Sequence, residues 1–188
     1  MPGKCGVGWL FVLAALSPAG RLPAAETRVP VTFSGGYETD PRDGGRPVAL
    51  VAGGLGVKPE VFRVAFRGVT PSRNGPPTRE EARRNKQALM KVLGPLGVTN
   101  DRLDEVSNYY RYRPQNGERW PTSPAKAEAI VENGRIKRIV VTDGGSGYNG
   151  PPQAVVAGHE NTPLSVKLQY GADLKKNGTV GAIETPTP

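Results

Sequence analysis

The chain has 188 residues, among them 25 glycines and 19 prolines, and its formal net charge is +8. Glycine and proline together make up about 23% of the chain, roughly twice their average share of about 12%, while hydrophobic residues make up only 37%. This composition excludes a polytopic membrane protein, a collagen and a coiled coil, and it argues against a compact all-helical bundle.

The first 25 residues have the pattern of a secretory signal peptide. Lys4 precedes an apolar run of 12 residues, Cys5–Leu16, which is shorter than the roughly 20 residues that a membrane-spanning helix needs. Small residues follow the run and offer cleavage sites after Ala19 and Ala25, of which Ala25 is favoured. An uncleaved N-terminal anchor is the alternative.

Cleavage after Ala25 changes the composition of the chain. It removes the only cysteine and two of the 25 basic residues, so that 23 basic residues remain against 17 acidic ones, a net charge of +6. A domain without disulfides suits a bacterial exported protein better than a eukaryotic secreted one. We therefore expect a periplasmic or extracellular protein that touches the membrane only through its signal peptide.

Residues 26–46 are predicted to form an extended lead-in. The β-branched residues of 27–33 predict one strand, and Pro30 within it favours a position at the edge of a sheet. Turn-forming residues follow. Asp43 is then expected to cap a helix that starts near Pro47.

Residues 47–106 are predicted to form a small helical part. The apolar pattern indicates a helix, a stop at Gly56 and a second helix that begins at Pro59. Thr78 and Glu81 match a capping box at the start of the most regular helix of the chain. The buried stripe of this helix is expected to comprise five apolar residues: Ala82, Leu89, Val92, Leu93 and Leu96.

A weak internal repeat lies within this helical part. Leu55-Gly56-Val57 recurs as Leu96-Gly97-Val98, 41 positions later. In each copy an apolar helix precedes the glycine, which supplies the helix stop, and a short capped helix follows. Two such helix–LGV–helix units packed together would form a small core. Chance similarity is the alternative.

Residues 107–124 are predicted to form a strand and a loop. Tyrosine and arginine alternate over 107–114, which places Tyr109, Arg111 and Arg113 on one face of a strand and Tyr110 and Tyr112 on the other. The loop that follows contains Trp120.

Residues 125–188 are predicted to form an antiparallel β module. Apolar and polar residues alternate over 125–132, and the turn dipeptide Asn133-Gly134 separates them from the strand 135–141. Asn177-Gly178 lies 44 positions further on and predicts a second hairpin. The expected fold class is therefore α+β, with a small helical part followed by an antiparallel β part built of hairpins.

One segment of the β module carries a resemblance. The strand after Asn133-Gly134 runs into Thr142-Asp143-Gly144-Gly145-Ser146-Gly147-Tyr148, and Pro151-Pro152 follow. This stretch resembles a β-rich repeat of phage tail fibres and large bacterial surface proteins, which implies a structural module and not a reaction. The second copy in this chain lacks the glycine-rich segment. The helical part is similar, more loosely, to short exported bacterial proteins that mostly lack an assigned activity.

No combination of residues predicts catalysis or a metal site. His159 is the only histidine and has no cysteine to share a zinc ion, and no nucleophile motif supports a triad with Ser146 or Ser165. The acidic groups around Asp40 and Asp101 could bind calcium, but neither has EF-hand spacing, and capping and turns explain them. We expect no catalytic residue and no cofactor.

Cations and aromatic residues mix between residues 79 and 120, which is typical of surfaces that bind anionic chains. The predicted contact residues are Tyr110, Arg111, Tyr112, Arg113 and Trp120. We expect an exported, non-catalytic binding or structural module of the bacterial cell envelope, with an anionic polysaccharide or another envelope component as partner. A solvated basic face, a periplasmic enzyme or metal-dependent hydrolase with an unrecognised site, and a nucleic-acid-binding protein are the alternatives. Export argues against nucleic acid.

Overall fold

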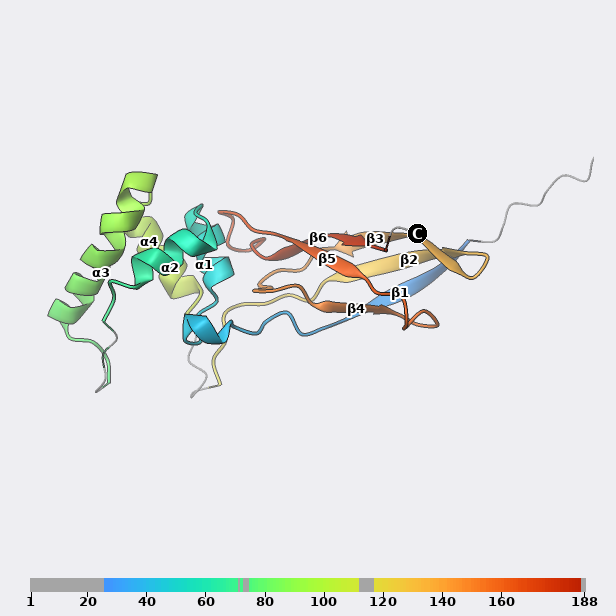
Figure 1. Ribbon diagram of the computed structural model, residues 1–188, viewed down its shortest axis with the longest axis horizontal. Coiled ribbons are helices and arrows are strands. Elements are labelled where there is room, and N and C mark those ends of the chain that lie inside the picture. Colours follow the sequence, from blue (N-terminus) through green and yellow to red (C-terminus); the bar gives the residue numbers. More distant parts are fainter. Residues whose placement is uncertain (1–25, 71, 73–74, 112–116, 187–188) are drawn as a thin grey trace, which may run out of the picture.

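The computed structural model describes residues 26–70, 72, 75–111 and 117–186. These residues form an elongated body, in which four α-helices gather at one end and the strands at the other (Figure 1). The predicted α+β class with antiparallel strands is confirmed. The predicted signal peptide lies outside the described residues and stays a prediction. Within the described ranges, no helix combines the length and the hydrophobicity that crossing a membrane requires.

The two helix–LGV–helix units are present. They comprise α1 (Val48–Leu55) with α2 (Pro59–Phe66), and α3 (Arg79–Leu93) with α4 (Asn100–Tyr109), the latter two joined through the 3₁₀ turn η2 (Gly94–Leu96). At the corners, φ is +70° at Gly56 and +88° at Gly97. The amide of the valine that follows each glycine donates to the carbonyl five residues earlier, over N···O distances of 3.0 and 3.3 Å. The repeated sequence therefore makes the same helix stop twice.

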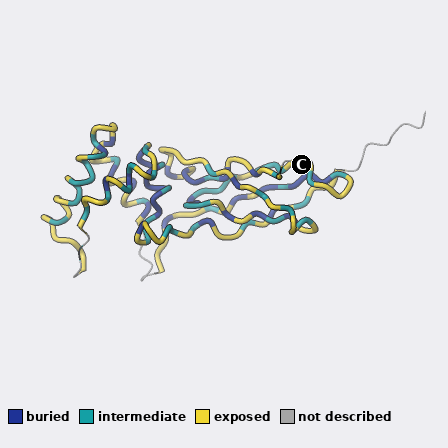
Figure 2. Tube along the Cα trace, viewed as in Figure 1, coloured by how far each residue is buried: buried dark blue, intermediate teal, exposed yellow. Residues whose placement is uncertain are grey.

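Helix α3 begins as predicted but packs less than predicted. The capping box is formed: the Thr78 hydroxyl accepts from the Glu81 amide (3.2 Å), and the Glu81 carboxylate accepts from the Thr78 amide (2.7 Å). Of the expected buried stripe, Leu93 is fully buried, whereas Ala82 is exposed and Leu96 is 56% exposed. Figure 2 shows why, since α3 lies at the outer end of the molecule, where few neighbours cover it.

The helices enclose one hydrophobic core. Helix α1 packs against both α2 and α4, and α2 packs against α3. The fully buried side chains at the centre of this core are Leu50, Ala52, Leu93 and Val106. Leu174, from the loop between the last two strands, completes it and ties the helical end to the β end.

The predicted strand over 107–114 is wrong where the structure describes it, because α4 continues to Tyr109. Leu103, Val106 and Tyr110 follow one another at helical spacing and all three are buried. Burial of this face favours the helix over the two-residue alternation of tyrosine and arginine. The remainder of the predicted strand, 112–114, lies outside the described residues.

The first hairpin is confirmed. Strands β2 (Lys126–Glu132) and β3 (Arg135–Asp143) are antiparallel, and φ is +50° at Asn133 and +71° at Gly134, as a type I′ turn requires. The four-stranded sheet has the order β3-β2-β1-β4, where β1 is Thr27–Ser34 and β4 is Gln153–Val156.

The position of β1 corrects the prediction that Pro30 favours an edge. Residues 27–30 pair with β2, and residues 31–34 pair with β4. The strand is therefore central in the sheet, but each half is paired on one side only. Pro30 is tolerated because its half of the strand needs no hydrogen-bond donor towards β4.

The second predicted hairpin has a different connection. Strands β5 (Ser165–Gln169) and β6 (Thr179–Glu184) pair antiparallel, but the nine residues 170–178 join them. Asn177 has no positive φ and is completely buried, so Asn177-Gly178 is not a hairpin turn. Strands β5 and β6 share a second core with the four-stranded sheet, made of small and β-branched side chains that include Val31, Ala127, Ala129, Val156, Val166 and Val180.

The strand predicted over 27–33 is confirmed as β1, and the rest of the lead-in differs in part from the prediction. It contains the 3₁₀ turn η1 (Pro41–Asp43), which Asp40 caps by accepting from the Arg42 amide at 2.9 Å. Asp43 does not cap α1. Its buried carboxylate binds Arg63 instead, because an ion pair with a neighbouring helix is available at this corner.

Candidate functional site

The structure separates the five predicted contact residues. Tyr110 and Trp120 are each only 3% exposed, Arg111 is exposed, and Tyr112 and Arg113 lie outside the described residues. The expected surface is thus corrected: two of its three aromatic residues are core residues and cannot contact a ligand at the surface. Burial of aromatic rings is favourable enough to override the strand pattern.

Both buried aromatic residues use their polar atoms inside the protein. The Tyr110 hydroxyl donates to the Leu174 carbonyl (3.3 Å) and accepts from the Asn177 side-chain amide (2.9 Å). Burial raises the pKa of Tyr110 to about 12. The Trp120 indole N–H donates to the Gly147 carbonyl (2.8 Å). These contacts hold helix α4 and the loop 117–125 onto the β end.

Arginines gather instead around a double hollow next to η1. The first compartment has a volume of about 450 Å³ and is lined by Gly44, Gly45, Arg46, Pro47, Val51, Phe62, Phe66, Ser107, Tyr110 and Arg111. The second has a volume of about 400 Å³ and is lined by Arg42, Asp43, Gly44, Arg46, Val48, Arg63, Phe66 and Arg67. We call the two compartments together the arginine cleft.

Three elements position the arginine cleft. Turn η1 and the glycines after it bring Arg46 to the start of α1, where φ of +58° at Gly44 reverses the chain. Arg67, the C-cap residue of α2, lies four residues after Arg63, and Phe66 likewise lies four residues after Phe62. Cations and rings therefore form adjacent stripes. The end of α4 supplies the opposite wall.

Asp43, which lines the cleft, and Asp40, which precedes η1 beside it, are both already paired with arginines. Asp43 accepts from Arg63 through both oxygens, at 2.8 and 2.9 Å, and its side chain is 3% exposed. The half-buried Asp40 binds the exposed Arg42 at 2.6 Å. The hydrogen bonds from Arg42 lower the pKa of Asp40 to about 2. Neither carboxylate is left to neutralise a further cation.

Three other arginines of the cleft form no ion pair with a described carboxylate. The Arg46 guanidinium donates to the Asp43 backbone carbonyl (3.0 Å), and its carbon lies 4.0 Å from the centre of the Phe66 ring. Burial lowers the pKa of Arg46, and the charge of Asp43 opposes this shift. Arg67 is exposed, and the Arg111 side chain donates to the Asn108 side-chain oxygen. The cleft thus holds uncompensated positive charge beside apolar surface.

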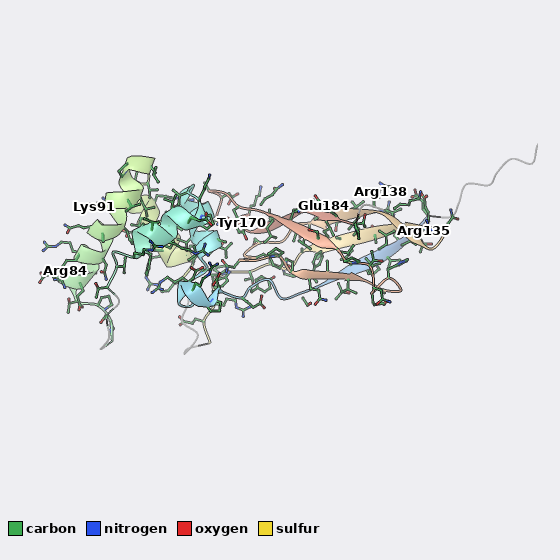
Figure 3. All side chains as sticks on the ribbon, in the orientation of Figure 1. Arg84, Lys91, Arg135, Arg138, Tyr170 and Glu184 are labelled. Carbon is green, nitrogen blue, oxygen red and sulfur yellow. The ribbon has the colours of Figure 1, made fainter. Side chains whose placement is uncertain are left out.

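The other cations lie on open surfaces. Figure 3 shows Arg84 and Lys91 on α3 at one end of the molecule and Arg135 and Arg138 on β3 at the other. Arg84 pairs with Glu80 at 3.0 Å on the exposed face of α3. An exposed ion pair of this kind contributes little to the stability of the folded protein. None of these four lines the arginine cleft.

The ranges that the structure describes contain no group of three or more His, Cys, Asp or Glu residues that could hold a metal ion. His159 lies in the loop after β4, and only its backbone forms hydrogen bonds with other described residues. Of the acidic residues considered for calcium, Asp104 binds Lys86 (2.6 Å) and Glu105 binds Arg102 (2.7 Å).

The arginine cleft was not among the sites that the sequence predicted. The residues around Arg42 were expected to form turns, and the predicted contact residues all lie between 110 and 120. One signal was available, namely four arginines within two short segments that the predicted helix pair would bring together. The chain matches no protein-family model, no curated protein and no solved structure.

Proposed function

We propose that the chain is an exported, non-catalytic binding module of the bacterial cell envelope, which contacts anionic polymers or glycans through the arginine cleft. One observation carries the proposal: Arg46 and Arg67 face a hollow and form no ion pair with a described carboxylate. The signal-peptide pattern of residues 1–25 and the resemblance of residues 133–152 to a surface-protein repeat support the location.

The chemistry of the cleft suits carboxylate, phosphate or sulfate groups. A guanidinium presents a planar fork of N–H donors that matches two oxygens of such an anion. Arg46 is half-buried, so an anion beside it is less screened by water and salt than one on an open surface. An anion would also offset the cost of partly burying this charge.

Arg46→Gln is expected to weaken binding to polygalacturonate at low salt by about tenfold or more, because a charge-assisted hydrogen bond contributes about 1.5–3 kcal/mol. Isothermal titration calorimetry measures the change. Thermal unfolding of the variant separates this loss from a loss of folding, since Arg46 also contacts Asp43 and Phe66.

The matched control is Arg135→Gln, which removes the same charge from the exposed start of β3, at the opposite end of the molecule (Figure 3). It should leave the affinity within about twofold, because a distant surface charge adds only screened attraction. If both variants lost the same affinity, binding of polygalacturonate would depend on the net charge of the protein alone, and the cleft would not be the site.

Export has a separate test. When the full chain is produced in a bacterium, the periplasmic or extracellular fraction should contain a form that begins at Glu26, as cleavage after Ala25 requires. Intact mass spectrometry of each cell fraction reports cleavage and location together. An intact chain recovered only from the cytoplasm would contradict export and favour the nucleic-acid-binding alternative.

A further inference from the structure

Arg46 divides the arginine cleft into its two compartments. Both compartments are lined by Gly44, Arg46 and Phe66, and no other residue belongs to both. The Arg46 guanidinium is held from two sides, by the hydrogen bond to the Asp43 carbonyl and by the Phe66 ring beneath it. It therefore forms a fixed ridge between the two hollows.

The geometry of the ridge leaves donors available on both sides. Arginine has five N–H donors in the plane of its guanidinium. Arg46 lies over Phe66 and donates to the Asp43 carbonyl through one terminal nitrogen. The Phe66 ring contacts the flat face of the guanidinium and leaves the N–H donors in its plane free to form hydrogen bonds. Those donors can therefore reach an anion in either compartment.

Each compartment also has a second cation of its own. Arg111 lines the first compartment, and Arg67 lines the second, and neither forms an ion pair with a described carboxylate. An anionic group in either compartment would therefore lie between Arg46 and one further arginine. A ligand with a single anionic group uses one of these positions and leaves the other empty.

The aromatic residues of the cleft do not favour nucleic-acid bases. Single-stranded nucleic acid binds to exposed ring faces on which bases can stack. Phe62 and Tyr110 are 4% and 3% exposed, and Arg46 covers the Phe66 ring. The described part of the cleft thus provides charge without a stacking platform, and an anionic chain on a sugar or polyol backbone can bind through its charges without one.

We infer that the ligand is an acidic carbohydrate polymer that crosses Arg46 and places one anionic group in each compartment of the arginine cleft. The inference rests on the proposed function and adds the ligand class and its mode of binding. The shared chemistry is an anion repeated along a sugar or polyol chain, as a uronate carboxylate or as a phosphodiester. Two anionic groups on one chain raise the affinity because the second binds at a high effective concentration.

The test is a length series of oligogalacturonates, from one unit to six, with a parallel series of glycerol phosphate oligomers to distinguish carboxylate from phosphodiester. Between one unit and the length that spans Arg46, the affinity of the wild-type protein should rise by more than about tenfold. This exceeds the statistical gain from adding units. In Arg67→Gln the rise should disappear, because the second compartment then lacks the arginine that lines it without an ion pair to a described carboxylate. Arg135→Gln should keep the full rise.

The outcomes separate this inference from the proposed function. If no oligomer binds the wild-type protein, both are overturned. If oligomers bind and Arg46→Gln weakens them, but one unit binds as tightly as six, the cleft remains an anion site and the spanning mode is wrong. Tighter binding of an oligothymidylate with the same number of charges would overturn the choice of a carbohydrate.

Discussion

Asn177→Asp is expected to lower the free energy of unfolding by about 3 kcal/mol or more, because it removes buried hydrogen-bond donors and places a carboxylate there. Asn177 is completely buried. Its side-chain nitrogen donates to the Leu50 carbonyl (2.7 Å) and the Tyr110 hydroxyl (2.9 Å), and its oxygen accepts from the Gly171 amide (3.0 Å). Aspartate keeps the acceptor and loses both donors. Urea unfolding measures the difference.

The chain offers a matched control in Asn133→Asp. Asn133 is also followed by glycine, but it is exposed at the β2–β3 turn. Asp-Gly suits a type I′ turn as Asn-Gly does, so the free energy of unfolding should stay within about 0.5 kcal/mol. If both substitutions proved equally mild, the buried hydrogen bonds of Asn177 would contribute nothing to stability.

The contacts of Asn177 also bear on how the molecule unfolds. Leu50 lies on α1, Tyr110 follows α4, and Gly171 belongs to the loop between β5 and β6. One side chain thus joins the helical end to the β end, in addition to Leu174 in the helical core. We therefore expect the two ends of the wild-type protein to unfold in a single transition. The unfolding curves measured by far-UV circular dichroism, which reports helix, and by aromatic fluorescence should then coincide.

Gly145→Ala is expected to lower the free energy of unfolding by about 3 kcal/mol or more, because a methyl group there meets backbone atoms that cannot move independently. At Gly145, φ is +61°, and an added Cβ would lie 2.3 Å from the Ser123 carbonyl oxygen and 2.7 Å from the Ala125 nitrogen. Ser123 and Ser146 exchange two backbone hydrogen bonds at this crossing, at 2.9 and 3.1 Å. Chemical denaturation measures the loss.

Gly158→Ala isolates the cause. Its φ of +78° is equally unfavourable for alanine, but an added Cβ meets no atom within 4 Å. This variant should lose only about 1 kcal/mol, the cost of the left-handed conformation. The difference between the two variants is the cost of the steric conflict. If Gly145→Ala lost no more than the control, the close approach of segments 121–125 and 144–148 would not constrain the fold.

The glycine-rich segment around Gly145 contacts several other parts of the β end. The Gly147 amide donates to the Asn177 carbonyl and the Tyr148 amide to the Gly178 carbonyl, at 2.9 and 3.0 Å. Tyr148 is 1% exposed, stacks on Tyr37 at 4.7 Å, and accepts a hydrogen bond from the Ala125 amide. The segment is therefore the crossing point of the β end, and its glycines are required by neighbouring backbone as well as by turns.

The sequence alone determined the features whose partners lie within a few residues. The Thr78 capping box, the two Leu-Gly-Val helix stops and the Asn133-Gly134 hairpin each depend on hydrogen bonds or torsion angles inside one short segment. Such features can be predicted from sequence because the residues that adopt the conformation are also the ones that stabilise it. The α+β class follows from them.

Only the tertiary structure decided where distant residues meet. Asp43 binds Arg63, which lies 20 positions away in the sequence, and Asn177 donates to the carbonyl of Leu50, which lies 127 positions away. In each case the polar group was assigned a local role, as a helix cap or as a turn residue. Burial overrode that role, because a buried polar group must be satisfied by whichever partner the packing brings near. The arginine cleft arises in the same way, from helix packing that places cations of separate segments around one hollow.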